Sequence, residues 1–409
     1  MTETNWAGNL TYSGEVIRPE TIEGLQQAVA RSSSVRAIST RHSFCDIADA
    51  DLVVDLGELP ATIDIDTERN LARVGGLVSY GMLIPALAEH DLALHNLASL
   101  PHISVAGAIA TGTHGSGDTN GNLATAVSGL EFLLASGDLI EVDRTHPDFD
   151  GMVVSLGALG IVTAVTLDLE PASQFSQVVF EDIPLDTWTA SFDHVSAAGY
   201  SVSGFTRWAD VVEQTWVKSR SGSEPAPGTL LDVAPCGEDR HVIRELSPES
   251  CTPQRGSIGS WAHRLPHFKL DFTPSAGEEI QSEFFIDRAD LPGASAALRD
   301  AEPDLRRALQ MSEVRTVAAD QLWMSPNYGR DSVAFHFTWQ LDSALADAAA
   351  STVWEALAPF DPRPHWGKVA PFGPDMLRSF ERAGDFSALA DRLDPGGTFR
   401  NDWFRRLFG

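Results

Sequence analysis

Short apolar runs alternate with amphipathic stretches over the first 170 residues, a pattern typical of mixed helix and sheet. Residues 21–31 and 82–92 carry apolar side chains at helical spacing, so each predicts a helix. Two apolar runs flank the turn Ser136-Gly137-Asp138 and predict a β-hairpin. The expected strands are residues 35–38, 52–54, 72–76, 130–135, 139–142 and 161–169.

The pattern changes near residue 172. Residues 280–286, 313–318 and 333–341 predict longer strands, and residues 342–357 predict a helix. The stretch 221–264 is rich in Gly, Pro and Ser and is expected to be a long loop region. A chain of 409 residues exceeds one ordinary hydrophobic core, so the change predicts a second domain.

Two of the predicted strands have one polar and one apolar face. Phe335, Phe337 and Trp339 share a face that belongs in a core. His336 and Thr338 share the opposite face, and Glu313 and Arg315 lie two apart on another strand. Such polar faces lie either in solvent or along a water-filled cavity. In the first case, Glu313 and Arg315 would form an exposed ion pair.

Residues 95–117 form an unusual glycine-rich segment, with glycines at 107, 112, 115 and 117. It lacks the Gly-Lys-Ser/Thr of a P-loop, the GxGxxG of a Rossmann turn and the GxSxG of a nucleophile elbow. It predicts either a loop that brings backbone N–H groups close to a bulky ligand or a glycine-rich connector. Its histidines, at 95, 102 and 114, do not have zinc spacing.

Composition narrows the function classes. Apolar residues make up 43% and charged residues 21%, as in a globular protein. No stretch approaches the ~20 apolar residues of a membrane span, and the residues MTETNWAGNL at 1–10 lack the basic and apolar regions of a secretory signal, so a cytoplasmic protein is expected. A net charge of −28 argues against nucleic-acid and membrane partners. The acidic charge has three explanations between which the sequence does not choose: a neutral or cationic substrate, adaptation to a high-salt cytosol, or adaptation to an acid-tolerant cytosol.

Several longer motifs carry a family resemblance. RHSF at 41–44, VGGLVSYGML at 74–83, LASLPHISVAGAIATGTHGSG at 97–117, SLGALGIVT at 155–163 and LDPGGTFRN at 393–401 resemble the vanillyl-alcohol-oxidase-type flavoenzyme superfamily. Within it, the chain is similar to the bacterial alditol oxidases. That narrower resemblance is carried by TNWAGN at 4–9, RTVAAD at 315–320, YGRD at 328–331, HFTW at 336–339 and RPHWGKV at 363–369.

The resemblance implies an α+β fold in three segments. A two-lobed, PCMH-like FAD-binding domain is expected at 1–171 and an α/β substrate-binding cap domain at 172–379. A C-terminal segment, 380–409, is expected to return to the FAD domain. The family's FAD is attached through its 8α-methyl group to a histidine, which here is His42. The FAD-binding residues expected from the motifs are Ile38, Ser39, Thr40, Arg41, His42, Ser43, Ala98, Ser99, Ser104, Gly107, Thr111, Gly112, Thr113, His114 and Val162.

Three positions depart from the family pattern. Ser39-Thr40-Arg41 stands where Gly-Ser-Gly is common, so Arg41 either crowds the attachment loop or faces the pyrophosphate of FAD. Cys45 stands where Asn is common, and His95 replaces a Pro. Cys45, Cys236 and Cys251 show no disulfide or zinc spacing, and reduced thiols are expected.

The resemblance also implies a reaction. Sugar alcohols such as xylitol and sorbitol are oxidised at a primary hydroxyl to the aldose, by hydride transfer to flavin N5, and O2 is reduced to H2O2. Arg315 and Lys368 would stabilise the alkoxide and the reduced flavin, and His336 would hydrogen-bond the hydroxyl or accept its proton. Ala98 would admit oxygen. The implied substrate-binding residues are Ser99, Glu313, Arg315, Thr338 and Lys368.

Three other functions compete with this interpretation. One is a flavin dehydrogenase of the aldonolactone or sugar-acid type, which uses an acceptor other than oxygen. Another is a non-catalytic flavin- or carbohydrate-binding protein, and the third is a glycine-rich scaffold without flavin. The expected protein is a monomer whose partners are a polyol and O2.

Overall fold

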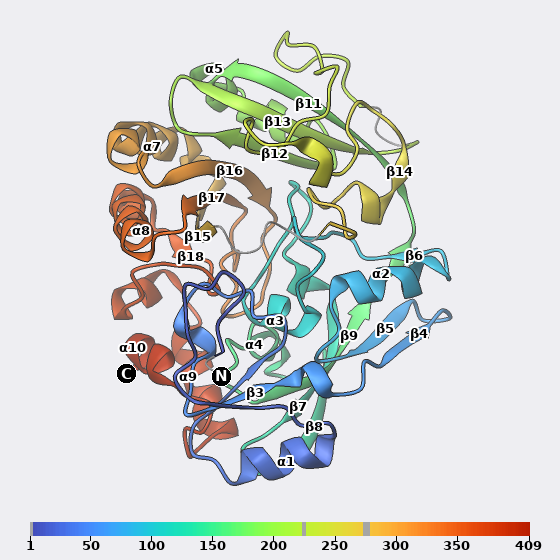
Figure 1. Cartoon of the computed structure of the whole chain (residues 1–409), viewed down its shortest axis with the longest axis vertical. Helices are drawn as coiled ribbons and strands as arrows, with labels where there is room; N and C mark the ends of the chain where they lie inside the picture. The colour runs from blue at the N-terminus through green and yellow to red at the C-terminus, as the bar shows by residue number, and fades with distance from the viewer. Residues whose placement is uncertain (1–2, 223–225, 273–278) are drawn as a thin grey trace.

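The computed structural model describes residues 3–222, 226–272 and 279–409. Figure 1 shows a broad sheet, coloured from green to orange, above a smaller blue and cyan part that contains the chain's N-terminal residues. The mixture of helices and sheets confirms the α+β fold class. Among the described residues, no helix combines the length and the apolarity needed to cross a bilayer.

The described residues of the N-terminal part contain three small sheets. One is parallel, with the order β1-β3-β2, and one is antiparallel, with the order β4-β5-β9-β7-β8. The third is the antiparallel pair β10-β6. Its helices are α1 (Ile22–Ala30), α2 (Tyr80–Ala88), α3 (Val105–Ala110) and α4 (Phe149–Val153). Its strands are β1 (Glu15–Ile17), β2 (Val35–Ile38), β3 (Leu52–Asp55), β4 (Ile63–Asp66), β5 (Leu71–Gly75), β6 (Leu92–Ala93), β7 (Val127–Leu133), β8 (Leu139–Asp143), β9 (Ile161–Asp168) and β10 (Glu170–Pro171).

Local chemistry accounts for the predicted elements. The side chain of Thr21 accepts a hydrogen bond from Gly24 N and caps α1. The hairpin β7–β8 is confirmed, as are the strands expected before and after it. The second helix was predicted at residues 82–92, but α2 spans Tyr80–Ala88. It begins earlier because Ser79 caps it, and it ends before Asp91, where the chain turns with a positive φ of 54°.

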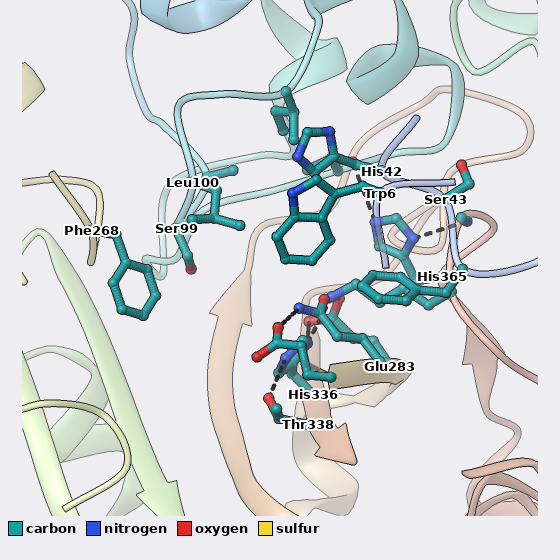
Figure 2. Close-up of a pocket in the computed structure, with 18 of the residues that line it drawn as sticks. Trp6, His42, Ser43, Ser99, Leu100, Phe268, Glu283, His336, Thr338 and His365 are labelled. Carbon is teal, nitrogen blue, oxygen red and sulfur yellow. Dashed lines mark hydrogen bonds and ion pairs between the residues drawn. The ribbon is translucent and has the colours of Figure 1, made fainter. Parts of the chain in front are cut away.

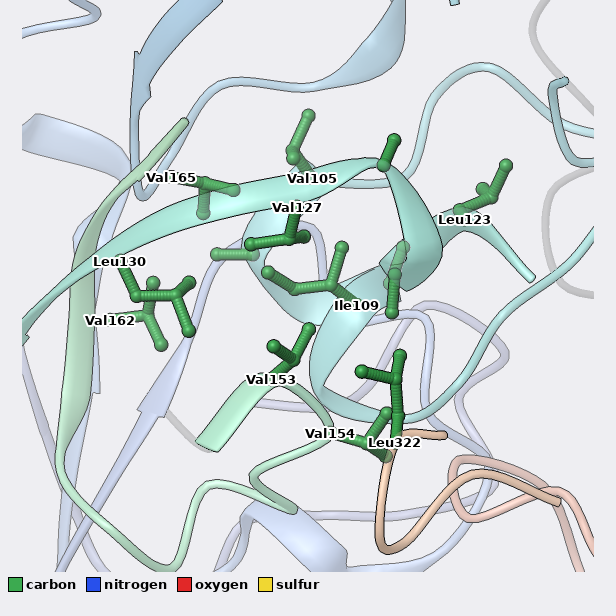
Figure 3. Close-up of a cluster of buried hydrophobic side chains, with 14 of the residues drawn as sticks. Val105, Ile109, Leu123, Val127, Leu130, Val153, Val154, Val162, Val165 and Leu322 are labelled. Atoms are coloured by element: carbon green, nitrogen blue, oxygen red, sulfur yellow. The ribbon is translucent and has the colours of Figure 1, made fainter. Parts of the chain in front are cut away.

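The glycine-rich segment was expected to be a loop or a connector. The structure differs, because the segment contains the short helix α3. Figure 3 shows Val105 and Ile109 of α3 in one cluster with Val127 of β7 and Val153 of α4. Leu322, from the loop after β16, joins the same cluster. The small residues between these apolar positions let α3 approach the strands closely.

The second large unit is one eight-stranded sheet, here called the cap sheet, with the order β14-β11-β13-β12-β16-β17-β15-β18. All its pairs are antiparallel. Its strands are β11 (Gln174–Pro184), β12 (Ser201–Thr206), β13 (Val211–Arg220), β14 (Gly259–Ser260), β15 (Glu279–Asp287), β16 (Leu309–Val317), β17 (Ser332–Gln340) and β18 (Arg363–Pro364). The associated helices are α5 (Leu185–Ala190), α6 (Phe192–Ser196), α7 (Leu291–Leu305) and α8 (Ser343–Leu357).

The cap sheet has an apolar and a polar face, as the sequence predicted. Phe335, Phe337 and Trp339 are fully buried in one cluster with residues of α7 and α8. In Figure 1, these two helices lie together along one side of the sheet. The alternate residues of β15, β16 and β17 therefore point away from the helices, toward the N-terminal part.

The end of the chain contacts its beginning. Helices α9 (Ala383–Leu393) and α10 (Asp402–Phe408) lie near the N-terminal residues in Figure 1. Asn401 caps α10 with its side-chain oxygen and donates from Nδ2 to the carbonyls of Ile47 and Asp49. Arg406 forms an ion pair with Asp46, with 2.7 Å between Nη2 and Oδ1.

Candidate active site

A cavity of about 670 Å³ lies between the N-terminal part and the polar face of the cap sheet. The glycine-rich segment and residues 37–44 line one side, and β15, β16 and β17 line the other. A smaller cavity of about 120 Å³ shares eight lining residues with it. The shared residues are Ala37, Ile38, Ser39, Ser43, Ala48, Ser104, Gly107 and Thr111.

His42 lies in the wall of the larger cavity, and neither of its ring nitrogens has a hydrogen-bond partner among the described residues. Its ring stacks on Trp6, with 5.2 Å between centroids and 23° between planes (Figure 2). Burial, followed by the nearby His102, lowers the pKa of His42 to about 4. The imidazole is therefore neutral at physiological pH and has a free lone pair, as a nucleophile requires.

The N-terminal segment holds the His42 loop. Trp6 N donates to the carbonyl of Arg41 at 2.8 Å, and Asn5 Nδ2 donates to the carbonyl of Ser43 at 2.9 Å. Arg41 has a positive φ of 58°, and its guanidinium forms an ion pair with Glu3, with 2.7 Å between Nη1 and Oε2. The sequence left two alternatives for Arg41, which would either crowd the attachment loop or face the pyrophosphate. In the structure, its guanidinium is paired with Glu3.

Most of the expected FAD-binding residues line these two cavities. All of them except Gly112 and Val162 line the larger cavity, and Val162 lines the smaller one. Gly112 lines neither cavity; it has a φ of +68°, and an added Cβ would lie 3.0 Å from Pro326 Cδ. Its position is explained by the turn after α3, which needs a residue that tolerates positive φ.

Cross-strand register brings the charged side chains together. Glu283 of β15 pairs with His336 of β17, which also pairs with Glu313 of β16. Directly opposite side chains of neighbouring strands lie about 5 Å apart, so these three form one row across the sheet. Arg315 lies two residues beyond Glu313 on the same face.

Glu283 is the centre of the cluster. Its Oε1 lies 2.6 Å from Arg315 Nη2 and 3.1 Å from His114 Nε2, and its Oε2 lies 2.7 Å from Lys368 Nζ. Burial alone would raise the pKa of Glu283, but Lys368, His114 and Arg315 hold it well below its ordinary value. Glu283 thus stays ionised and holds two cations at the cavity wall.

Glu313 anchors a second branch of the network. His267 Nε2 lies 2.7 Å from Glu313 Oε1, and Lys218 Nζ lies 3.0 Å from His267 Nδ1. Burial would raise the pKa of Glu313, but Arg315 and His267 lower it. Burial lowers the pKa of Lys218 to about 7. Because His267 bonds Lys218 through one nitrogen, it can donate to Glu313 from the other.

His336 is fixed by two neighbours. Lys368 Nζ lies 2.7 Å from its Nδ1, and its Nε2 lies 3.2 Å from Thr338 Oγ1 (Figure 2). Burial, followed by Lys368, lowers the pKa of His336 to about 3. A neutral ring that accepts from Lys368 is a hydrogen-bonding group for a hydroxyl and a weak base.

The structure thus brings Glu313, Arg315, His336, Thr338 and Lys368 to one wall, and Ser99 lines the same cavity. Glu313 and Arg315 are 95% buried, which rules out an exposed ion pair. The sequence did not indicate Glu283, Trp6, His267 or the contact between His114 and Glu283. It also gave no role to His365, which lines the cavity with its Nε2 3.4 Å from Thr113 Oγ1. Glu283 had a detectable signal, since it alternates with Phe284 within a predicted strand, whereas His267 lies in the long loop region and had none.

The residues present fit FAD. The two cavities together are lined by the glycine-rich segment and by Gly76, where residues without bulky side chains leave room for a large cofactor. His42 has no other partner for its nitrogens among the described residues. No group of His, Cys, Asp and Glu among those residues could hold a metal ion.

Two family descriptions match parts of the chain. The FAD binding domain family matches residues 15–143, and the D-arabinono-1,4-lactone oxidase family matches residues 280–407.

Solved structures share the fold at low sequence identity. The chain has a TM-score of 0.78 and 15% identity with cholesterol oxidase from B. sterolicum, over 100% of this chain and 96% of that one. It has a TM-score of 0.74 and 14% identity with the xylooligosaccharide oxidase from Myceliophthora thermophila C1 in complex with xylobiose, over 98% and 93%. These likenesses confirm the fold class.

Curated relatives cover the full chain. An L-gulono-1,4-lactone dehydrogenase of Mycobacterium tuberculosis is 28% identical over 99% of both chains. An alditol oxidase of Streptomyces sp. (strain IKD472 / FERM P-14339) is 46% identical over 99% of this chain and 98% of that one. At that identity and coverage, the chain belongs to the alditol oxidase family of FAD-dependent oxidoreductases.

Proposed function

We propose that the protein is an alditol oxidase, which oxidises a primary hydroxyl of xylitol, sorbitol and related polyols to the aldose and reduces O2 to H2O2. The observation that carries this proposal is the cluster around Glu283. It holds Arg315 and Lys368 at one wall of a cavity whose other wall contains His42 and Ser99. Family membership at 46% identity supports the same reaction.

FAD, when bound, would accept the hydride of the carbinol carbon and pass the electrons to O2. The N-terminal residues that line the two cavities would hold it, and His42 would form the covalent link to its 8α-methyl group. The neutral ring of His42, with one nitrogen lone pair free, supports this attachment. Trp6 fixes the plane of that ring by stacking.

A polyol is neutral and has many hydroxyls, so recognition needs several paired donors and acceptors. Glu313 accepts, Arg315 and Lys368 donate, and Ser99 and Thr338 can do both. A short alcohol would leave some of these buried groups unpaired, which disfavours its binding.

Arg315 and Lys368 have a second role when the hydroxyl loses its proton. Burial would lower the pKa of Arg315, but Glu313 and Glu283 raise it, so the guanidinium stays charged. Burial lowers the pKa of Lys368. These two donors would stabilise the developing alkoxide, and His336 would hydrogen-bond the same oxygen.

A dehydrogenase of the lactone or sugar-acid type is the second candidate. It is favoured by the match of residues 280–407 to the D-arabinono-1,4-lactone oxidase family and by the 28% identity to a lactone dehydrogenase. Rapid reoxidation of the reduced enzyme by O2 in a stopped-flow experiment would support the oxidase, and sluggish reoxidation would support the dehydrogenase.

The remaining parts of the proposal concern organisation. We place the domain boundaries near residues 171 and 380. We also propose a monomer in a reducing, cytoplasmic compartment. The three cysteines are unpaired, in agreement with such a compartment.

The test of function is a peroxide assay on purified protein with xylitol and sorbitol, with L-gulono-1,4-lactone as the comparison. Peroxide formation from the polyols at a higher kcat/KM than from the lactone supports the proposal. Turnover of the lactone alone would refute it. A spectrum of the acid-denatured protein tests the flavin link, since the yellow colour stays with the chain only if the bond exists.

A further inference from the structure

The polar face of the cap sheet continues beyond the residues assigned to the polyol. Gln281 of β15 pairs with Thr338 of β17, and the next pair outward is Glu279 with Gln340. All four side chains line the larger cavity. The sheet therefore presents three successive polar rows, and the third, Glu279 with Gln340, has no role in the reaction described above.

Strand geometry gives the spacing of these rows. Residues two apart on a strand are about 7 Å apart, so the third row lies about 14 Å from the row of Glu283 and His336. An extended six-carbon chain measures only about 6 Å from its first to its last carbon, given ~1.5 Å C–C bonds. A hexitol whose reacting hydroxyl contacts His336 therefore ends near Thr338, short of Glu279.

Glu279 has unused hydrogen-bonding capacity. Within the part of the chain that the structure describes, its side chain accepts one hydrogen bond, from Gln281, whose Nε2 donates to Oε1 at 2.5 Å. Among the described residues, no Lys, Arg or His forms an ion pair with it. Burial raises the pKa of Glu279. A half-buried carboxyl group at a cavity wall with one neutral partner can accept further hydrogen bonds from ligand hydroxyls.

The cavity has an apolar side and a mouth at the surface. Leu246, Phe268 and Phe272 line it from the segment 241–272, and Leu246 is 51% exposed. Figure 2 shows Phe268 facing the cavity next to Ser99. A polar wall and an aromatic wall together suit a sugar ring, which has hydroxyls at its edge and C–H groups on its faces.

We propose that Glu279 and Gln340 form an outer subsite that binds the second sugar ring of a glycosylated sugar alcohol. A β-1,4-linked disaccharide alcohol is about twice as long as a hexitol and reaches this row, and its terminal CH2OH is oxidised to CHO while O2 becomes H2O2. This inference rests on the proposed function, which supplies the oxidation step.

The experiment compares cellobiitol with sorbitol on the flavin-loaded enzyme, by peroxide formation. The wild type is expected to oxidise both. The measured quantity is the kcat/KM for cellobiitol divided by the kcat/KM for sorbitol. Glu279→Ala and Gln340→Ala are each expected to lower this ratio. The expected decrease for Glu279→Ala is about tenfold, because a hydrogen bond to a charged group is lost. Glu355→Ala, an exposed carboxylate on α8 behind the sheet, removes the same charge and should leave the ratio unchanged.

Two results would overturn the outer subsite: oxidation of sorbitol without oxidation of cellobiitol by the wild type, or an unchanged ratio in both variants. Gln340 is exposed at the cavity mouth, so its variant serves if Glu279→Ala fails to fold. If sorbitol itself is not oxidised, the proposed function fails. The outer subsite is then tested separately, by calorimetric binding of cellobiitol to the same holoenzyme. Binding that weakens about tenfold in Glu279→Ala supports the subsite, and no binding refutes it.

Discussion

Replacing Glu283 by Gln would remove the carboxylate that holds the cationic wall of the cavity. The change preserves the size of the side chain but leaves Arg315 and Lys368, at 2.6 and 2.7 Å, without their shared counter-ion. Removing one partner of a buried ion pair costs about 3–5 kcal/mol, because an uncompensated charge remains buried. At about 2.1 cal/mol/K per residue, the unfolding entropy of 409 residues is about 0.9 kcal/mol/K, so each kcal/mol lowers Tm by roughly 1 °C and a fall of about 3–6 °C is expected.

Glu279→Gln is the matched control. Glu279 lies on the same face of the same strand, and its hydrogen-bond partner is the neutral amide of Gln281. Its substitution should cost less than about 1 kcal/mol, the typical net value of a neutral hydrogen bond.

The assay is thermal unfolding of the flavin-loaded proteins, followed by circular dichroism, together with the pH profile of kcat. Loss of Glu283 should also lower the pKa of Lys368 further, which moves the alkaline limit of activity to lower pH. A Tm for Glu283→Gln equal to that of Glu279→Gln would refute the idea that Glu283 is the organising charge.

Three further predictions follow from the same site. His42→Ala should release all flavin on denaturation, as seen by in-gel fluorescence, and flavin that stays with the denatured variant would exclude His42 as the anchor. Lys368→Met should lower kcat/KM for xylitol by about 10²–10³-fold, the usual loss for one preorganised donor, and a change below threefold would contradict its role. Burial, followed by the nearby Lys218, lowers the pKa of His267 to about 4 in the folded protein. The unfolded chain therefore takes up the proton first, and the free energy of unfolding should fall as pH drops from 6.5 to 4. In urea titrations, His267→Gln should reduce this slope by up to about 1.4 kcal/mol per pH unit, and an unchanged slope would show that other groups cause it.

Local patterns predicted most elements of the fold. The caps and apolar spacing of α1, the turn between β7 and β8, and the alternation in β17 are all encoded within a few residues. The glycine-rich segment was misjudged in part, because α3 is short and its small residues have weak helical periodicity. Its helix is stabilised by packing against Val127 and Leu322, which lie far away along the chain.

The sequence by itself determined which residues share a face, and thus that Glu313 with Arg315 and His336 with Thr338 would act together. Its longer motifs determined the family and the expected anchor, His42. Only the tertiary structure decided that these faces meet inside one cavity and that Glu283 links them. Strand register and the return of Lys368 to β15 bring together atoms from residues 32 and 85 positions apart. No local pattern encodes such contacts, because burial and pairing across the sheet, and not spacing along the chain, make those charges partners.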